Sequence, residues 1–332
     1  MAGAGNLFVM LDGFVDALPA DPAAFAREAC TRSAPNGQRP DGVILVKRPR
    51  AGGDCVMEIY NADGSRPETC GNGLRCVAKL AFDRGHVAKN PFVIETDAGP
   101  VTARVALEPA RTARCDGRSL DAQVAPSSDA RGATRSDARG PASSDAHGAT
   151  SSNARGSASS DAHGAASSDA QVATTREARV VRATIAMGVP RILARGERLH
   201  ALGGEHSAVL VDVGNPHCVL FVEDERTAPV TKLGPALERH ARFPRGTNVE
   251  FLALRRDGAF LRVWERGVGE TQACGTGACA AALAAVDAGR ATFPVTLRVP
   301  GGVLVVDSDG RGGVTLEGPV EEVASASSVR AR

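Results

Sequence analysis

Short β-branched runs bounded by turns dominate the pattern of apolar and polar positions along the chain. Such runs predict strands at residues 6–12, 43–46, 56–60, 92–95, 101–107, 180–187, 208–213, 218–222, 249–254, 260–264, 295–299 and 303–306. Helical spacing predicts helices at residues 22–31, 73–84, 230–242 and 277–288. Strands far outnumber helices and often follow one another across turns alone. The pattern therefore predicts an α+β architecture and argues against a doubly wound sheet.

An octapeptide repeat interrupts this pattern between residues 119 and 174. Copies of S-S-D-A-x-G-A-x start at Ser127, Arg135, Ser143, Ser151, Ser159 and Ser167, after a diverged copy at Ser119. Apart from one proline, the central copies hold no apolar residue larger than Ala. They cannot bury enough surface to offset the entropy lost on ordering, and a solenoid would need a recurring apolar position. We therefore expect a disordered insertion.

The two halves that flank the repeat resemble each other. Cys70 and Cys274 each open a C-G-x-G segment, and each precedes a small-residue helical pattern that carries another cysteine. Upstream, Gly5-Asn6 and Gly214-Asn215 each lead into an apolar run. This correspondence predicts a duplicated domain. The expected order is an N-terminal domain at 1–118, the repeat insertion at 119–174, a C-terminal domain at 175–318, and a polar tail without a closing strand at 319–332.

Composition narrows the class of protein. The chain has 332 residues, 43% hydrophobic and 23% charged, which suffices for two ordinary globular domains. Lys plus Arg number 39 against 38 Asp plus Glu, and aromatic residues make up 4%, which argues against nucleic acid or a membrane surface as partner. The sequence has neither a signal-peptide pattern nor a run of roughly 18 apolar residues. We expect a cytoplasmic protein with a small-molecule partner.

Cytoplasmic cysteines are not expected to form a disulfide framework, although the chain has eight of them. No pair has CxxC spacing, so we expect no metal site. Six cysteines are interpreted as small buried or otherwise unremarked residues: Cys30, Cys55, Cys76, Cys115, Cys218 and Cys279.

Cys70 and Cys274 differ from these because each lies just before a predicted helix start. Unpaired backbone N–H groups and the positive end of the helix dipole favour a thiolate there, so we expect a lowered thiol pKa. The neighbouring glycines allow a ligand to approach the backbone closely. The free N–H groups would form a cradle suited to a carboxylate, and they belong to Gly71, Asn72, Gly275 and Thr276.

Two such thiols on opposite sides of one carbon could invert an α-amino acid. One thiolate would remove the α-proton, and the opposite thiol would return a proton from behind. No motif indicates pyridoxal phosphate or a nicotinamide, so we expect no cofactor. A buried structural cysteine is the simpler interpretation of a lone C-G-x-G segment. Two copies in register favour a reactive pair.

Further polar residues leave alternatives open. His217 could polarise a thiol or cap a turn. Glu265 and Arg266 could contact the amine and a carboxylate of a substrate, although adjacent opposite charges are usually a solvated pair. Neutral donors and acceptors come from three asparagines that equally suit turns: Asn61, Asn215 and Asn248.

Together, these motifs resemble the diaminopimelate epimerase family. The resemblance covers most of the chain outside the repeat. The matching segments are Gly5-Asn6-x-Phe8, Asn61-Ala62-Asp63-Gly64-Ser65, Cys70-Gly71-Asn72-Gly73-Leu74-Arg75-Cys76, Gly214-Asn215-Pro216-His217-Cys218, Thr247-Asn248 and residues 265–278. The last of these is highly specific, and the ensemble is more so.

The resemblance implies two pseudosymmetric domains, each a curved, mostly antiparallel sheet around a central helix, with the site in the cleft between them. It implies cofactor-independent interconversion of LL- and meso-diaminopimelate in lysine and peptidoglycan precursor biosynthesis, with domain closure and a homodimer. Cys70 and Cys274 match the acid/base thiols, and the backbone cradle matches Gly71, Asn72, Gly275 and Thr276. The side chains that hold the amines and the distal end match Asn6, Asn61, Asn215, Asn248, Glu265 and Arg266.

Two departures and two alternatives accompany this resemblance. Leu7 stands where the family usually has an acidic residue, and the chain starts only a few residues earlier, so we expect an incomplete first strand. A related racemase for another amino acid would keep both thiols but change the distal contacts. A non-catalytic binding protein would need neither thiol. The presence of Arg266, Asn61 and Asn248 favours the diacid–diamine substrate.

Overall fold

The computed structural model describes residues 1–35, 37–67, 70–109 and 178–323. These residues belong to one compact unit, formed by Met1–Ala110 and Glu177–Arg332. The predicted insertion at 119–174 and Cys115 lie outside the described residues, so the expectation of disorder stays a prediction.

The described part of the chain contains four α-helices and a sheet of sixteen strands. The helices are α1 (Pro22–Ala29), α2 (Gly71–Asp83), α3 (Val230–Glu238) and α4 (Gly275–Asp287). The strands of the first half are β1 (Ala2–Gly3), β2 (Asn6–Asp12), β3 (Gly42–Lys47), β4 (Cys55–Asn61), β5 (Phe92–Thr96) and β6 (Gly99–Pro109). Those that follow are β7 (Ala178–Ala186), β8 (Arg191–Ala201), β9 (Gly204–Asp212), β10 (Pro216–Val222), β11 (Asn248–Arg255), β12 (Gly258–Glu265), β13 (Gly269–Thr271), β14 (Val295–Val299), β15 (Gly302–Ser308) and β16 (Val314–Pro319).

The strand order repeats one pairing scheme twice. In the first half, β2 and β3 are parallel, β3 and β4 antiparallel, β4 and β5 parallel, and β5 and β6 antiparallel. The second half repeats this scheme with β10, β11, β12, β14 and β15. The two halves join where β7 pairs with β16. The topology confirms the α+β class and the internal duplication.

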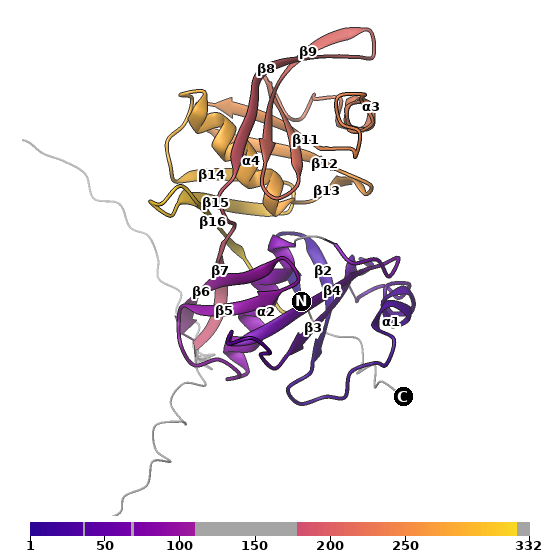
Figure 1. Cartoon of the computed structure of the whole chain (residues 1–332), viewed down its shortest axis with the longest axis vertical. Helices are drawn as coiled ribbons and strands as arrows, with labels where there is room; N and C mark the ends of the chain where they lie inside the picture. The colour runs from indigo at the N-terminus through magenta and orange to yellow at the C-terminus, as the bar shows by residue number, and fades with distance from the viewer. Residues whose placement is uncertain (36, 68–69, 110–177, 324–332) are drawn as a thin grey trace, which may run out of the picture. The chain divides into compact units, whose positions relative to one another are not determined.

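A central helix packs against the strands of each half (Figure 1). The buried side chains of α2 pack with those of β3 to β7, and the small side chains of α4 pack with those of β9 to β16. In α4, the run from Ala280 to Ala282 is fully buried, because alanine lets strands approach the helix axis closely. The helices need this burial, since an isolated helix of 13 residues is marginal in water.

Both ends of the described chain bear on the sequence prediction. The strand β16 closes the sheet against β7 and ends at Pro319, where the polar tail was expected to begin. The expectation that this tail lacks a closing strand stays a prediction, because residues 324–332 lie outside the described residues. Beyond β16, Val320 is 2% exposed, and Glu321 exchanges two backbone hydrogen bonds of 2.9 Å with Ala2. The first strand, β1, is short but pairs with β2.

The strand β7 follows the insertion in the sequence but packs with the first half. It pairs with β6, and Val180, Ala183 and Ile185 lie in the core around α2. The sequence-based domain bounds remain a prediction. The strand β7 follows the insertion in the sequence but lies in the core of the first half, so the border between the halves does not coincide with the insertion.

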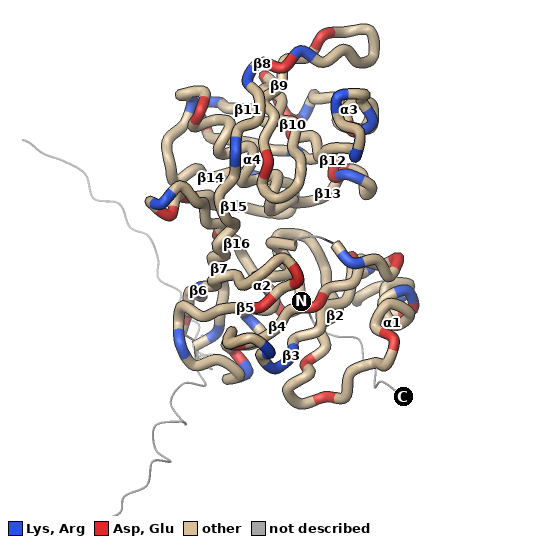
Figure 2. Tube along the Cα trace, in the orientation of Figure 1, with Lys and Arg blue, Asp and Glu red and all other residues tan. Residues whose placement is uncertain are grey.

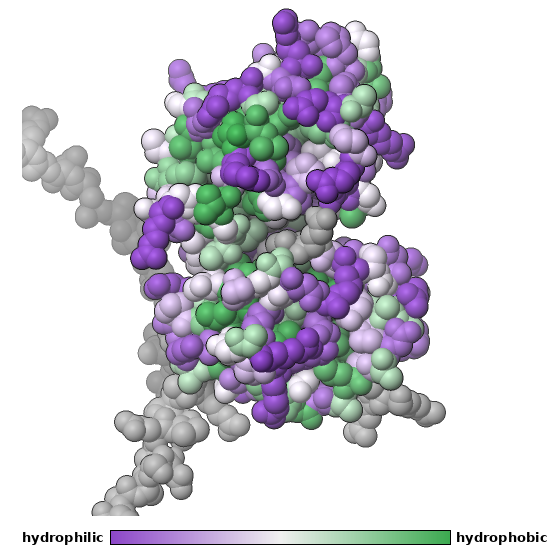
Figure 3. All heavy atoms as spheres, viewed as in Figure 1, coloured by the Kyte–Doolittle hydropathy of each residue, from purple (hydrophilic) through white to green (hydrophobic). Residues whose placement is uncertain are grey.

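Acidic and basic residues are interspersed along the described trace and do not form one region of like charge (Figure 2). The face in Figure 3 carries hydrophilic side chains with small apolar patches between them. Within the described ranges, no helix combines the length and apolar character needed to cross a bilayer.

Buried thiols predict how the stability of this fold depends on pH. Burial raises the pKa of Cys55 and Cys279 to about 12, and that of Cys30 and Cys76 to about 11, from an ordinary value of 9.0. The unfolded chain therefore loses these protons first. Stability that is fully present below pH 9 should be lost as the pH rises through the folded-state values.

Replacing Cys279 by Ala should make this loss shallower, by up to about 1.4 kcal/mol per pH unit, because one buried titrating group is gone. Urea unfolding of both proteins at several pH values from 8 to 11 measures the two slopes. Equal slopes would contradict the assignment of Cys279 as a protonated core thiol.

Candidate active site

The helix α2 begins at a thiol. Cys70 has extended backbone angles, φ −138° and ψ 93°, and its Sγ accepts the N–H of Gly73 at 3.2 Å. A helix start leaves N–H groups without partners, which Ser, Thr, Asp or Asn usually satisfies. Here a sulfur takes that place, so the thiol is fixed at the positive end of the helix.

The helix α4 begins in the same way. Cys274 has φ −115° and ψ 118°, and its Sγ accepts the N–H of Gly277 at 3.3 Å. The Sγ also lies 3.4 Å from Oγ1 of Thr276. The duplicated C-G-x-G segments are thus two copies of one cap, as their spacing predicts.

The first turns of the two helices are in contact. A Cβ atom placed on Gly275 would lie 3.4 Å from Cα of Gly71 and 2.9 Å from Cδ2 of Leu316. A Cβ on Gly71 would lie 3.3 Å from the same leucine carbon. Glycine at both first helical positions therefore lets the two helix starts, with their thiols, come together.

Asn72 ties the two halves at this contact. Its Nδ2 donates to the carbonyl of Ala273 at 3.0 Å and to Oδ1 of Asn6. Its Oδ1 accepts from Nη2 of Arg75 at 2.6 Å. The predicted residues Asn6 and Asn72 thus lie together, and the amide of Asn72 spans from α2 to the residue before Cys274.

A buried carboxylate–histidine pair lies beside the second thiol. Nδ1 of His217 is 2.7 Å from Oε1 of Glu250, and both side chains are fully buried. Nε2 of His217 is 2.9 Å from Oδ1 of Asn215, whose Nδ2 is 3.5 Å from Oγ1 of Thr276. The histidine therefore does more than cap a turn: a continuous polar chain joins it to the start of α4.

Glu265 links the sheet to both thiols. Its Oε1 accepts from the hydroxyl of Thr271 at 2.5 Å, and its side chain also hydrogen-bonds Cys274. Burial raises the pKa of its carboxyl group, and its charge in turn raises the pKa of both Cys70 and Cys274. Glu265 is therefore part of the thiol site rather than half of a solvated pair.

Asn248, at the start of β11, is hydrogen-bonded to the backbone of Arg266, which follows β12. Oδ1 of Asn248 accepts the backbone N–H of Arg266 at 2.9 Å, and its Nδ2 donates to the carbonyl of Pro216 at 2.9 Å. Asn61 instead donates to Oγ of Ser65 at 3.0 Å. Its described hydrogen bonds stay within its own turn, so the structure does not join it to the other predicted residues.

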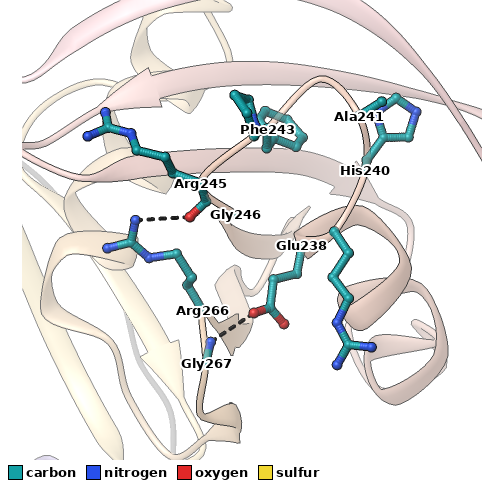
Figure 4. Close-up of a pocket in the computed structure, with 10 residues that line it drawn as sticks. Glu238, His240, Ala241, Phe243, Arg245, Gly246, Arg266 and Gly267 are labelled. Carbon is teal, nitrogen blue, oxygen red and sulfur yellow. Dashed lines mark hydrogen bonds between the residues drawn. The ribbon is translucent and has the colours of Figure 1, made fainter.

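The guanidinium of Arg266 lines a surface hollow of about 410 Å³ (Figure 4). Its Nη1 donates to the carbonyl of Arg245 at 3.4 Å, and the N–H of Gly267 donates to Glu238 at 2.9 Å. Neither thiol lines this hollow. Among the residues that the structure describes, no group of three or more His, Cys, Asp or Glu side chains is arranged to hold a metal ion.

The prediction of a lowered thiol pKa is wrong for this structure. Burial raises the pKa of Cys70 to about 12, although the N–H of Gly73 and the charge of Arg75 act in the opposite direction. Burial and the carboxylates of Glu265 and Glu250 raise the pKa of Cys274 well above its usual value. The helix-start field exists, but desolvation of the charged form outweighs it.

Several residues of the site were not singled out in the sequence. Glu250 interrupts an apolar strand, and Arg75 interrupts an apolar helix face, which is the signal that could have found them. Gln38 donates to the carbonyl of Gly5 at 2.8 Å and so supports the turn before Asn6. The N–H of Leu7 donates to a carboxylate oxygen of Asp41 at 2.7 Å, so an acidic partner is supplied from another segment.

The duplicated α+β fold is shared by solved structures whose names include racemases, epimerases and phenazine biosynthesis proteins. A probable proline racemase from Agrobacterium radiobacter has this fold, with a TM-score of 0.56, 13% identity, and coverage of 96% of this chain and 88% of that chain. A hydroxyproline epimerase from Agrobacterium vitis aligns with a TM-score of 0.52 and 15% identity, covering 90% of this chain and 79% of that chain. At these identities the likeness shows the fold alone.

Sequence comparison identifies the family. The diaminopimelate epimerase profile matches residues 1–113 and 209–323. The diaminopimelate epimerase of Desulforudis audaxviator is 39% identical and covers 100% of this chain and 98% of its own length. That of Desulfitobacterium hafniense is 36% identical, with coverage of 97% and 94%. The chain belongs to the diaminopimelate epimerase family.

The contact between the helix starts predicts unequal sensitivities at its two glycines. Gly→Ala within a helix usually gains about 0.5–1 kcal/mol. Gly275→Ala should instead destabilise by about 1–3 kcal/mol, because the new methyl group would meet Leu316 and the backbone of Gly71. Gly71→Ala should cost less, since its nearest neighbours are the mobile ends of Leu316 and Met187.

Urea unfolding of the two variants measures this difference. Adding Leu316→Ala should recover part of the loss in Gly275→Ala but not add to it. Additive effects would mean that the helix starts are not packed as described.

Proposed function

We propose that this chain interconverts LL- and meso-diaminopimelate without a cofactor, using Cys70 and Cys274 as its two acid/base groups. The observation that carries the mechanism is the pair of sulfur caps on two helices whose first turns touch. Membership of the diaminopimelate epimerase family supports the substrate. The reaction makes the protein an isomerase in the biosynthesis of lysine.

The cradle of backbone N–H groups would hold the carboxylate at the reacting carbon. In the first turn of each helix, N–H groups point out of the helix and carry partial positive charge. Gly71 and Asn72 provide these groups from α2, and Gly275 and Thr276 from α4. A carboxylate bound there would sit at the junction of the two halves, with a thiol at each side.

The proposed inversion transfers one proton in and one proton out. The thiolate on one face accepts the α-proton as the C–H bond breaks, and the thiol on the other face donates its proton to the carbon. The electron pair left on carbon is delocalised towards the carboxylate, which the helix N-termini stabilise. After the step the two sulfurs have exchanged their protonation states, so atoms and charges balance.

Forming the first thiolate requires help, because burial holds both thiols protonated. The charge of Glu265 acts on both thiols, and its raised pKa suits it to exchange a proton with either of them. His217 is assigned an assisting role through the polar chain that reaches Thr276. Asn6 and Asn215 would hold the amine near the reacting carbon.

The distal end of the substrate would contact Asn61, Asn248 and Arg266, of which Arg266 supplies a positive charge for a second carboxylate. A related racemase that acts on another amino acid would not need these three side chains. A cytoplasmic location and a homodimer are part of the same proposal. Both rest on the family resemblance.

Incubation with LL-diaminopimelate in deuterated water should place deuterium on one α-carbon and yield the meso isomer. Cys70→Ala and Cys274→Ala should each lower the rate by at least about a hundredfold, the usual contribution of one acid/base group. Mass spectrometry and chiral chromatography follow label and configuration. Cys55→Ala, a buried thiol outside the site, is the matched control and should stay close to the unmodified chain. Unimpaired turnover by either active-site variant would refute the two-thiol mechanism, and turnover of other amino acids but not this one would refute the substrate.

Deleting residues 119–174 should leave turnover largely intact. The ends that flank the insertion already lie side by side, because Pro109 and Ala178 are register partners in the β6–β7 pair. The residues that remain can close this hairpin, and shortening a long connection changes its closure entropy only slowly. The same deuterium assay, with a thermal unfolding curve as control, tests this. A folded but inactive deletion variant would show that the insertion takes part in the reaction.

A further inference from the structure

The internal duplication allows each residue of one half to be matched to its counterpart in the other. In the first half, Phe8 pairs with Gly42 across the parallel β2–β3 pair, and in the second half His217 pairs with Asn248 across β10–β11. The turns at Asn6 and Asn215 have the same geometry in the two halves, which makes Phe8 the counterpart of His217. Two residues further along the partner strands, Ile44 is therefore the counterpart of Glu250.

The first turns of the helices support this match independently. A Cβ on Gly73 of α2 would lie 2.9 Å from Cδ1 of Ile44 and 3.2 Å from Sγ of Cys70. A Cβ on Gly277 of α4 would lie 2.9 Å from Oε1 of Glu250 and 3.3 Å from Sγ of Cys274. The same place beside each thiol thus holds a methyl group in one half and a carboxylate in the other.

A second difference lies within the helices. Counted from the capping cysteines, Arg75 of α2 corresponds to Cys279 of α4. Arg75 is fully buried, and its Nε and Nη1 have no hydrogen-bond partner in the described structure. Burial lowers the pKa of its guanidinium to about 10, so it remains charged at neutral pH. No ion pair is described for it, so its field acts on its surroundings uncompensated.

Both thiols face the carboxylate of Glu265, but only Cys70 also faces a cation, Arg75, and only Cys274 faces a second carboxylate, Glu250. Cys70 faces Arg75 and Cys76 of its own helix and Glu265 of β12. Cys274 faces Glu250 of β11 and Glu265 of β12, with the hydroxyl of Thr276 on its own helix. Burial raises the pKa of the Glu250 carboxyl group, and the neighbouring His217 of β10 acts in the opposite direction.

We propose that Arg75 and Glu250, two buried charges that break the duplication, make the thiols inequivalent, so that Cys70 ionises first and Cys274 keeps its proton. Arg75 and Glu250 are positioning residues for charge, since they act through the thiols. This inference rests on the proposed two-thiol function, in which one sulfur must start as base and the other as acid. Among enzyme molecules with one ionised thiol, it assigns Cys70 as the base of the more populated form.

Each turnover exchanges these states. Cys70 gains the proton taken from carbon, and Cys274 loses the proton that it delivers. The minor form that results has its negative charge beside Glu250 and Glu265, so it is electrostatically unfavourable. A proton must then move from Cys70 back to Cys274, through solvent or a neighbouring acid, before the predominant form is restored.

The pH dependence of thiol alkylation tests the order directly. The reduced full-length chain is exposed to short pulses of iodoacetamide from about pH 7 to above pH 12, so that the range spans the raised thiol pKa values, and the rate at each cysteine is followed by peptide mass spectrometry. The midpoint of each rate profile reports ionisation and not accessibility, because a constant access factor scales the rate at all pH values. The midpoint of Cys70 should lie at least about one pH unit below that of Cys274.

Two variants assign the cause. Glu250→Gln should lower the midpoint of Cys274 by about one unit and leave that of Cys70 nearly unchanged. Arg75→Met should raise the midpoint of Cys70, and Arg75→Lys should restore it. Glu225→Gln, which removes another buried carboxylate of the second half, is the matched control and should move neither midpoint.

Equal midpoints or the reverse order in the unmodified chain would overturn the inference, even if no variant folds. Unchanged midpoints in folded Glu250→Gln and Arg75→Met would overturn it as well. Conversion of LL-diaminopimelate by the unmodified chain is measured in parallel. An inactive chain with the expected order would defeat the proposed function alone, and an active chain with equal midpoints would defeat the inference alone.

Discussion

The unmet N–H groups at the start of a buried helix are the constraint on which this structure depends. A helix that begins inside a protein must find acceptors for its first N–H groups or suffer the penalty of burying them unpaired. In α2 and α4 that acceptor is a sulfur, while further N–H groups of the first turn stay available for a ligand. The same requirement that fixes the helix start therefore fixes the orientation of each thiol, and the remaining N–H groups are those of the carboxylate cradle that we propose.

Two such caps become one site because nothing but backbone separates the helices. Gly71 and Gly275 occupy first helical positions, and any side chain on Gly275 would collide with Leu316 of β16. That leucine comes from the strand that joins the halves through β7, so the sheet seam and the helix contact support each other. Asn72 then crosses the junction with a hydrogen bond to Ala273. Distortion at the seam would separate the thiols as well as weaken the fold.

The sequence predicted most of this frame because its signals are local. Alternation and β-branching placed twelve strands and four helices, and the C-G-x-G spacing identified both thiols and their duplication. The strand β8 was missed because its polar residues at Arg195, Glu197 and Arg198 hide the alternation, and β16 because Gly318-Pro319 reads as a turn. The strand β8 forms a hairpin with the next strand, β9, whereas β16 also pairs with β7, which is far away in the chain and which no local pattern encodes.

The direction of the pKa shifts in the site was harder to predict from the sequence than the residues that form it. The field at a helix start is visible in sequence, whereas burial is a property of the assembled fold, so the direction of the thiol pKa shift was predicted wrongly. Arg75 and Glu250 were overlooked for the same reason, since one charge in an apolar run has no meaning until its neighbours are known. A duplicated frame supplies two sulfurs that cap equivalent helices. An inversion needs them unequal, because two thiols cannot start the reaction and two thiolates cannot finish it. Charges that differ between the halves are the simplest way for a symmetric backbone to hold one proton in a defined place.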